Sequence, residues 1–437
     1  MPLDYLFCVS RTVMGDCTRV LFRLVRELQS RDRSVAVIST GRYPEWFAPG
    51  LPFQQVDDLK EAAEAYEAHH IVLSNIHLLA FLGHLARKAK MSLYSQGYES
   101  FYYTEPEGLL SDVSVLSEMQ REPLQILAAS PSIQTLLRER LDKDSVQVGI
   151  AVESIAVPRQ VRNRRILMSG PPLASFKGMA TGFRALKRLA ETMEIELVLL
   201  STETKERPHL VDLPFPSQTI YRPSERAISQ QLAAASLYFC SSHYEGNDLL
   251  TIQSFQLGTP VVSTENFSTF DKKGESTMKL TSSSSPEIQS QDLAAVLQSP
   301  GDAEAMADRA REWVSGRYQW NDFVDCFEVA CGSAPHFEIE HAKLERYRQQ
   351  MIEEGVFTPK VVYETCRTAK ATMDRLLEQA VLSDSDLELL SEIRSGLKPY
   401  LGHRGTEYYG AIRSAYDLAG VLLMKSKSVF TSSSRSP

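Results

Sequence analysis

Short apolar runs alternate with helix-like spacing over the first third of the chain. The runs that resemble buried strands lie at residues 4–9, 34–39, 71–74, 91–95 and 124–129. After the first run, apolar residues recur at the spacing of one helix face, at positions 21, 24, 25 and 28. Since strands that alternate with helices form parallel sheets, the pattern predicts a Rossmann-like α/β domain over residues 1–155.

A second α/β pattern begins at Arg165, after short β-like pieces and several arginines around residues 146–164. Its predicted strands are residues 165–169, 194–200, 236–241 and 261–263. Its predicted helices are residues 180–192, 227–235, 302–315 and 320–331, with a loop at 281–286. The sequence therefore predicts a second Rossmann-like domain over residues 156–335, which faces the first across a cleft.

Strand patterns fade after residue 335, and helical periodicity continues. The predicted helices are residues 342–354, 359–380, 386–397 and 406–424, which form a helical C-terminal extension over residues 336–425. Ser385 and Glu388 have the spacing of a capping box, so Ser385 is the expected N-cap of the third of these helices. The Ser-rich residues 426–437 are predicted to be a disordered tail.

Composition narrows the class of protein. The 437 residues are 43% hydrophobic and 23% charged, as in an ordinary globular protein, and the net charge of −8 argues against a nucleic-acid binder. The six cysteines lack metal-ligand or disulfide spacing, which indicates reduced thiols. The N-terminus does not resemble a signal peptide, and the most apolar stretch, residues 71–85, is too short and too polar to span a bilayer. We therefore expect a cytoplasmic protein with at most a peripheral contact to the inner face of the membrane.

The candidate chemistry lies in the second domain. The turn at residues 245–248 is rich in Gly and Asn and opens an apolar helix that Gly258 closes. The N–H groups and dipole at the start of such a helix attract anions, most often phosphate. Ser169-Gly170 and Lys177-Gly178 also follow a predicted strand. A lone lysine before a helix is more often solvated, but three such pieces together favour a diphosphate site.

The same segments carry a resemblance to a known family. The string EGNDLLTIQSFQLGTPVV (residues 245–262) resembles, without a gap, the donor-binding signature EGFGLPPLEAMACGTPVV of the retaining, GT-B fold glycosyltransferases of family 4. ILMSGPPLASFKG resembles the head of that family's second domain, and YQWNDFVDCF resembles its late helix. YSQGYESFYY resembles a segment of a subgroup that builds bacterial surface polysaccharides. The resemblance covers about residues 4–331.

The resemblance implies roles for individual residues. Lys177 would neutralise the leaving diphosphate, and Glu245 would hydrogen-bond the donor sugar. The other donor-side positions that it implies are Gly15, Ser169, Gly170, Gly246, Asn247, Asp248, Leu249 and Leu250. The implied acceptor-side positions are Gln96, Tyr98 and Glu99. The family needs neither a metal nor a separate cofactor, so we predict only a nucleotide-sugar as co-substrate.

Three positions depart from the family pattern. Gln253 stands where the family has a Glu that binds the nucleotide ribose, and an amide accepts through only one oxygen. Pro171 stands where the family has the Arg that partners Lys177, and Arg222 is a candidate replacement. Asp248 replaces a Gly, and a helix cap that is turned away from the ligand is its favoured interpretation.

Two functions follow from these patterns. The leading hypothesis is a hexosyltransferase that moves a hexose or deoxyhexose, with retention, to a glycan, a lipid-linked glycan or another hydroxyl acceptor. The alternative is a catalytically weak homologue that binds or scaffolds an active transferase, with the C-terminal helices as the partner or self-association surface. A nucleotide-sugar epimerase is less favoured because of the QGYE segment. His69, His70 and His77 are interpreted as surface or packing residues. The arginines at positions 19, 23, 26, 31 and 33 are interpreted as a solvated helix face in preference to a lipid-binding one.

Overall fold

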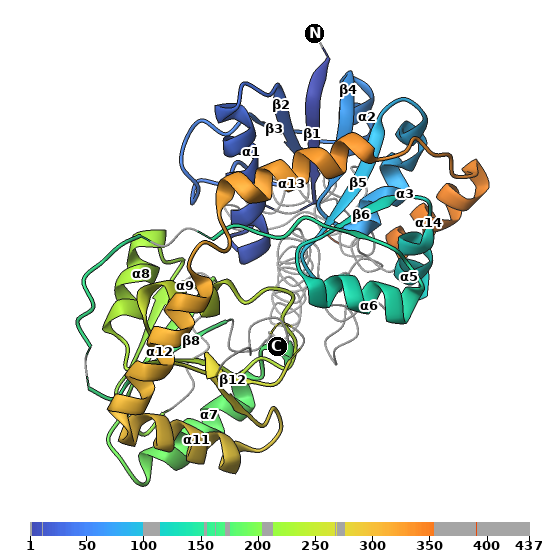
Figure 1. Cartoon of the computed structure of the whole chain (residues 1–437). Coiled ribbons are helices and arrows are strands. Elements are labelled where there is room, and N and C mark those ends of the chain that lie inside the picture. Colours follow the sequence, from blue (N-terminus) through green and yellow to red (C-terminus); the bar gives the residue numbers. More distant parts are fainter. Residues whose placement is uncertain are drawn as a thin grey trace, which may run out of the picture.

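The computed structural model describes residues 2–10, 12–98, 114–152, 155–161, 163–170, 175–202, 213–266, 268, 276–353 and 390. The helices predicted at residues 359–380, 386–397 and 406–424 and the tail at 426–437 therefore lie outside the described residues, apart from Leu390. The described chain forms two parallel sheets with helices packed around them (Figure 1).

The first sheet has seven strands in the order β3-β2-β1-β4-β5-β6-β7, and every pairing is parallel. The strands are β1 (Leu3–Val9), β2 (Val35–Ser39), β3 (Phe53–Gln55), β4 (Ala68–Leu73), β5 (Lys90–Ser95), β6 (Gln125–Ala128) and β7 (Val146–Gln147). The five predicted strands are confirmed. The sequence did not resolve β3 and β7, because they are short, lie at the sheet edges and have mostly exposed side chains.

Helices connect these strands. They are α1 (Asp16–Ser30), α2 (Leu59–Glu64), η1 (Ile76–Leu78), α3 (Leu79–Leu82), η2 (Gly83–Arg87), α5 (Ser114–Arg121) and α6 (Pro131–Leu141). The side chain of Asp58 caps α2, and that of Ser130 caps α6. The predicted apolar face of α1 is buried against the sheet, including Leu21, Leu24 and Leu28.

The second sheet has six parallel strands in the order β10-β9-β8-β11-β12-β13. They are β8 (Arg165–Ser169), β9 (Glu196–Ser201), β10 (Ser217–Tyr221), β11 (Leu237–Cys240), β12 (Val261–Thr264) and β13 (Lys279–Thr281). The helices are η3 (Ser175–Lys177), α7 (Met179–Ala190), α8 (Glu225–Ala234), α9 (Leu249–Leu257), α11 (Pro286–Gln298) and α12 (Pro300–Val314). The sequence did not predict the polar edge strands β10 and β13, nor α11, which Ser285 caps.

The helix α13 (Trp320–Ser333) packs on the first domain, although the predicted boundary at residue 335 grouped it with the second (Figure 1). Phe327 stacks on Phe7 of β1 with ring centroids 6.1 Å apart. Glu328 pairs with Arg31 and Arg33 at the end of α1, at 3.2 and 2.6 Å. After the second sheet the chain thus returns to the first domain, where α13 packs on β1 and on the end of α1.

The last described helix, α14 (His341–Glu353), also packs on the first domain (Figure 1). Tyr347 is fully buried, and its hydroxyl donates a hydrogen bond to Glu122 at 2.6 Å. Lys343 pairs with the same carboxylate, and Arg346 pairs with Glu118. The predicted extension therefore begins as an ordered helix that is held by a buried carboxylate.

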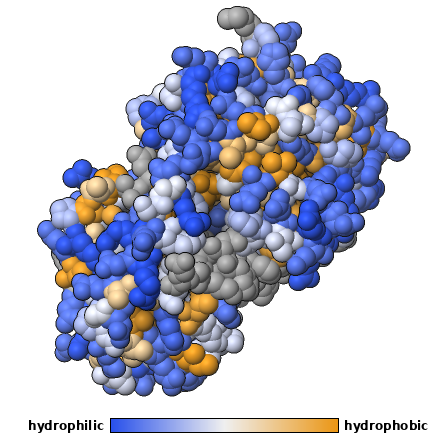
Figure 2. Space-filling view, in the orientation of Figure 1, coloured by the Kyte–Doolittle hydropathy of each residue, from blue (hydrophilic) through white to orange (hydrophobic). Residues whose placement is uncertain are grey.

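The face drawn in Figure 2 shows two lobes, each with a mostly hydrophilic surface and smaller hydrophobic areas. Within the described residues, none of the helices is both long and apolar enough to cross a bilayer. Two of the histidines that were interpreted as packing residues, His70 and His77, are buried in the first domain.

His70→Gln tests a buried imidazole in β4. Burial, reinforced by Lys90, lowers the pKa of His70 to about 4. The unfolded chain takes up this proton near pH 6.5 and the folded chain resists it, so stability falls as the pH drops from about 6.5 to about 4. We expect His70 alone to account for up to about 3 kcal/mol of that loss. His70→Gln can keep the hydrogen bond to Ser92.

Urea unfolding of both chains, near neutral pH and near pH 4.5, measures the effect. The variant should lose less stability on acidification than the wild-type protein. An equal loss in the two chains would show that the imidazole stays uncharged in the unfolded chain or is charged in the fold.

Candidate active site between the two domains

The central strands of the second sheet end where the two domains meet, and the predicted donor residues follow them. Ser169 ends β8, Gly170 follows it, and Lys177 lies in η3 soon after. The loop after β11 carries Glu245. Ligands of open α/β sheets bind at the carboxyl ends of the strands, where the chain turns to opposite sides. β8 is such a place, because β9 lies on one side of it and β11 on the other.

Backbone constraints fix the position of Lys177. The hydroxyl of Ser241 donates a hydrogen bond to the Lys177 carbonyl oxygen at 2.9 Å. Gly178 has a φ of 59°, and a Cβ there would lie 2.0 Å from the carbonyl oxygen of Ser241. Gly170 has a φ of 141°, and a Cβ there would lie 3.2 Å from Cγ of Lys177. The two glycines therefore allow the Lys177 side chain to lie across the end of β8.

Lys177 and Glu245 form an ion pair in which Nζ lies 2.5 Å from Oε1. The hydroxyl of Ser242 donates to the same carboxylate oxygen at 2.6 Å. Burial by itself would lower the pKa of Lys177, but the neighbouring carboxylates, chiefly Glu245, outweigh it and raise that pKa above its ordinary value. Burial also raises the pKa of Glu245, and Lys177 opposes that rise. Lys177 therefore stays protonated at neutral pH.

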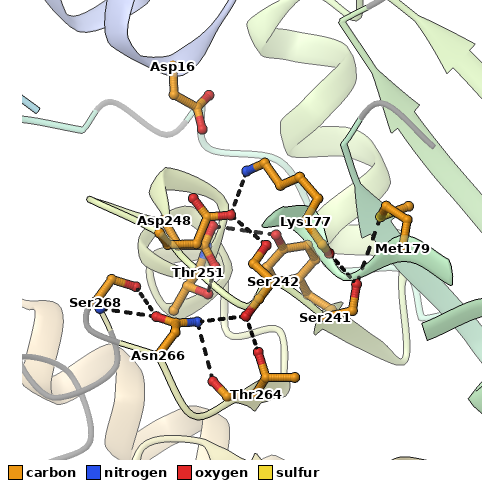
Figure 3. A network of polar contacts seen from close by, with 12 residues as sticks. Asp16, Lys177, Met179, Ser241, Ser242, Asp248, Thr251, Thr264, Asn266 and Ser268 are labelled. Carbon is orange, nitrogen blue, oxygen red and sulfur yellow. Dashed lines mark hydrogen bonds and ion pairs between the residues drawn. The ribbon is translucent and has the colours of Figure 1, made fainter. Parts of the chain in front are cut away.

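A buried polar network supports the loop that carries Glu245 (Figure 3). The carbonyl oxygen of Ser242 accepts hydrogen bonds from the Thr264 hydroxyl and from Nδ2 of Asn266, the latter at 3.3 Å. The Asn266 side-chain oxygen in turn accepts from the backbone and the hydroxyl of Ser268, both at 3.0 Å. Because each of these groups is buried and paired, the loop has little freedom to move away from Lys177.

Asp248 caps α9, as its favoured interpretation predicted. Its carboxylate accepts a hydrogen bond from the backbone N–H of Thr251 at 3.2 Å and another from the Thr251 hydroxyl. The Tyr238 hydroxyl donates to it at 3.4 Å. With these donors the Asp248 side chain is directed into the helix start and the sheet, so its predicted contribution to the donor site is structural.

The first turn of α9 faces two cavities. Leu250 lines a small one of about 30 Å³, and Leu249 lines a larger one of about 410 Å³. Backbone N–H groups in the first turn of a helix have no partners within the helix. The side-chain amide nitrogen of Asn247 is buried and has no partner within the described part of the chain. Apart from the N–H of Thr251, which Asp248 caps, these donors are available for an anion at the start of α9.

A loop of the first domain closes against the Glu245 loop. A Cβ on Gly246 would lie only 2.0 Å from the carbonyl oxygen of Gln96. The backbone N–H of Tyr98 donates a hydrogen bond to the Tyr244 hydroxyl. The structure therefore brings two of the predicted acceptor-side residues to the predicted donor residues, whereas Glu99 lies outside the described residues.

Sequence reasoning missed two charged residues at the start of α1. Asp16 and Arg19 line the small cavity together with Gly15 and Ser169. Arg19 was interpreted as part of a solvated face, but only 12% of its side chain is exposed, and it pairs with Glu225 of the second domain. Burial raises the pKa of Asp16 and the cations around it oppose the rise. The position of Gly15 and Asp16 in the loop between β1 and α1 was the available signal, since the carboxyl end of β1 lies at the domain junction.

Among the residues linked to the departures from the family pattern, Gln253 lies in the site and Arg222 does not. Gln253 is buried and lines the larger cavity, where its amide nitrogen donates to Glu225 at 3.4 Å. Arg222, the candidate replacement for the missing clamp arginine, is exposed and lines neither of the two cavities. Pro171 lies outside the described residues. Arg19, and not Arg222, is thus the arginine that the structure brings beside Gly15 and Ser169.

The described site is suited to an anion. Its cations are Lys177 and Arg19, and the start of α9 adds N–H groups and the positive end of a helix dipole. Within the described ranges, no group of three or more His, Cys, Asp and Glu side chains is arranged to hold a metal ion. Arginine and lysine side chains and a helix start are the groups with which proteins commonly bind phosphate.

No protein-family model and no curated protein sequence matches this chain. Solved structures do. Sucrose-phosphate synthase from Thermosynechococcus elongatus is 14% identical with a TM-score of 0.60, over 75% of this chain and 98% of the other. A glycosyltransferase from Rickettsia africae is 14% identical with a TM-score of 0.59, over 76% and 98%. HepE from Anabaena, in complex with UDP-glucose, is 14% identical with a TM-score of 0.58, over 76% and 100%.

At these identities the likeness concerns the fold. The chain has two Rossmann-like α/β domains arranged as in GT-B glycosyltransferases, and the predicted fold class is confirmed. The two sheets and most of the helix α13 fall within the region that the sequence resemblance covers, about residues 4–331.

Gly246→Ala tests the contact between the two loops. Because the added Cβ would overlap the Gln96 carbonyl oxygen, we expect the domains to separate and the chain to adopt a larger radius of gyration in small-angle X-ray scattering. Gly15→Ala is the matched control, since the nearest atom to a Cβ there is Oγ1 of Thr18 at 3.8 Å. Equal radii for Gly246→Ala and wild-type protein would show that the contact at Gly246 does not hold the domains together.

Proposed function

We propose that the protein is a glycosyltransferase that moves a sugar from a nucleotide-sugar donor to a hydroxyl acceptor. The observation that carries the proposal is the Lys177–Glu245 ion pair at the carboxyl ends of β8 and β11, beside the start of α9. The GT-B fold of the chain and the UDP-glucose bound to the similar HepE protein support a nucleotide-sugar as the donor.

The proposed chemistry follows from the charges. When the bond between the sugar and the diphosphate breaks, negative charge builds on the diphosphate oxygens. Lys177, which stays protonated, and the N–H groups of α9 would stabilise that charge. Glu245 would hold a hydroxyl of the donor sugar at a fixed position relative to Lys177.

The finer features are also proposed. The enzyme would belong to family 4, transfer a hexosyl or deoxyhexosyl group with retention, and need no metal or other cofactor, because Lys177 and the helix dipole supply the positive charge. The acceptor would be a glycan, a lipid-linked glycan or another hydroxyl compound, bound on the side of Gln96, Tyr98 and Glu99. The protein would act in the cytoplasm, with at most peripheral contact to the inner face of the membrane.

One observation favours the alternative function. Gln253, which replaces a ribose-binding Glu of the family, donates its amide to Glu225, a residue that is already paired with Arg19. A protein whose donor site is closed by its own side chains would serve as a scaffold or binding partner of an active transferase, through self-association or the C-terminal helices. A full chain that binds no nucleoside diphosphate, yet copurifies with an active transferase, would support this function.

Lys177→Ala and Glu245→Ala test the leading function. We expect the wild-type protein to hydrolyse or transfer at least one donor in a panel of nucleotide-sugars. Loss of a group that stabilises developing charge should lower kcat about 10²- to 10³-fold. Lys187→Ala, an exposed lysine of α7, is the control and should behave as wild type. The proposal is wrong if no nucleotide-sugar reacts and no nucleoside diphosphate raises the melting temperature.

A further inference from the structure

Arg19 is a buried cation that bridges the two domains. It lies in the first turn of α1, and 12% of its side chain is exposed. One guanidinium nitrogen lies 3.3 Å from Asp16, and the other pairs with Glu225 at the start of α8 in the second domain. The remaining nitrogen, Nε, is buried and has no partner in the described residues. A guanidinium in such a position retains capacity for another acceptor.

The same guanidinium faces the place that the proposed function assigns to phosphate. The small cavity is lined by Arg19 together with Gly15 and Ser169 and by Leu250 at the start of α9. Among the residues that line this cavity, Arg19 is the one with a positive charge. Lys177 lies beside the same strand end, because Gly170, which follows Ser169, contacts its side chain.

A carboxylate of the protein lies between the two cations. Asp16 contacts Arg19 directly, and the charges of Arg19 and Lys177 both stabilise its ionised form. Figure 3 shows Asp16 approaching Lys177 from the first domain, opposite the turn that carries Asp248. Asp16 thus contacts Arg19 and lies near enough to Lys177 for both charges to act on its carboxylate.

The charges of the site require a second cation for a diphosphate. The charge of Lys177 is already offset by Glu245 at 2.5 Å, and Asp248 adds a further carboxylate nearby. A diphosphate brings more than one negative charge to a place where these carboxylates already lie. Arginine suits this task because its planar fork can donate two parallel hydrogen bonds to phosphate oxygens.

We propose that Arg19 binds the diphosphate of the donor, exchanging Asp16 and Glu225 for phosphate oxygens. The proposal rests on the proposed function, because it assigns a residue to the same donor site. Arg19 would then take the place of the clamp arginine that Pro171 replaces. Because Arg19 belongs to the first domain and Lys177 to the second, a bound diphosphate would hold the two domains together from both sides.

The competing explanation is that Arg19 only forms the interdomain ion pair. Glu225→Gln separates the two explanations, since it breaks the same pair without removing the cation. If Arg19 binds phosphate, loss of Glu225 frees its guanidinium and leaves diphosphate binding as strong or stronger. If the pair is all that matters, Arg19→Gln and Glu225→Gln weaken binding alike.

The experiment is calorimetric titration of the full chain and its variants with ADP, GDP, UDP and TDP, and with the nucleoside that matches the best of them. We expect Arg19→Gln to bind the diphosphate about 10- to 100-fold more weakly, as for loss of a hydrogen bond to a charged group. Binding of the uncharged nucleoside should be unchanged, and Glu225→Gln should bind the diphosphate at least as well as wild type.

Arg19→Lys covers the case in which Arg19→Gln does not fold, because it keeps the charge and loses the fork, and intermediate affinity is expected. Wild-type-like affinity of Arg19→Gln, or of Arg19→Lys if only that variant folds, overturns the proposal. Equal weakening of Arg19→Gln and Glu225→Gln also overturns it. In both results the wild-type protein still binds, so the proposed function stands. A wild-type protein that binds none of the diphosphates overturns both proposals.

Discussion

The buried ion pair between Lys177 and Glu245 is the interaction on which the site depends. A buried pair adds little net stability, because desolvation of both charges offsets their attraction, but removal of one partner leaves an uncompensated charge. The surrounding structure meets this constraint in two ways. The Ser242 hydroxyl donates a hydrogen bond to the Glu245 carboxylate, and the Ser241 hydroxyl donates one to the Lys177 carbonyl oxygen. Gly178 and the polar network around Asn266 hold the backbone on the two sides of this pair.

The same constraint extends across the domain junction. Charges from both domains gather at the strand ends, with Asp16 and Arg19 from the first and Lys177 and Glu225 from the second. With Glu245 and Asp248, the carboxylates there outnumber the two cations, and each of these cations is already paired with a carboxylate of the protein. A bound anion must replace carboxylates rather than enter a vacant positive pocket, which links anion binding to the contact between the domains.

The chain path reinforces that link. After the second sheet, α13 returns to the first, where Phe327 stacks on Phe7 and Glu328 pairs with Arg31 and Arg33. The helix α14 then packs on the first domain through Tyr347 and the carboxylate of Glu122. The end of the described chain thus packs on the first domain, through α13 and α14.

The sequence by itself determined the two sheets, since central strands such as Leu237–Cys240 are continuous apolar runs whose burial on both faces leaves a clear pattern. It also determined the local chemistry around Glu245 and the Asp248 cap, because a helix start depends on adjacent residues. The polar edge strands, the packing of α13 on the first domain and the burial of Arg19 were decided only by the tertiary structure. Charged helix positions look alike in sequence, and only the partner that covers them, here Glu225 from 206 residues further along the chain, decides whether they are solvated.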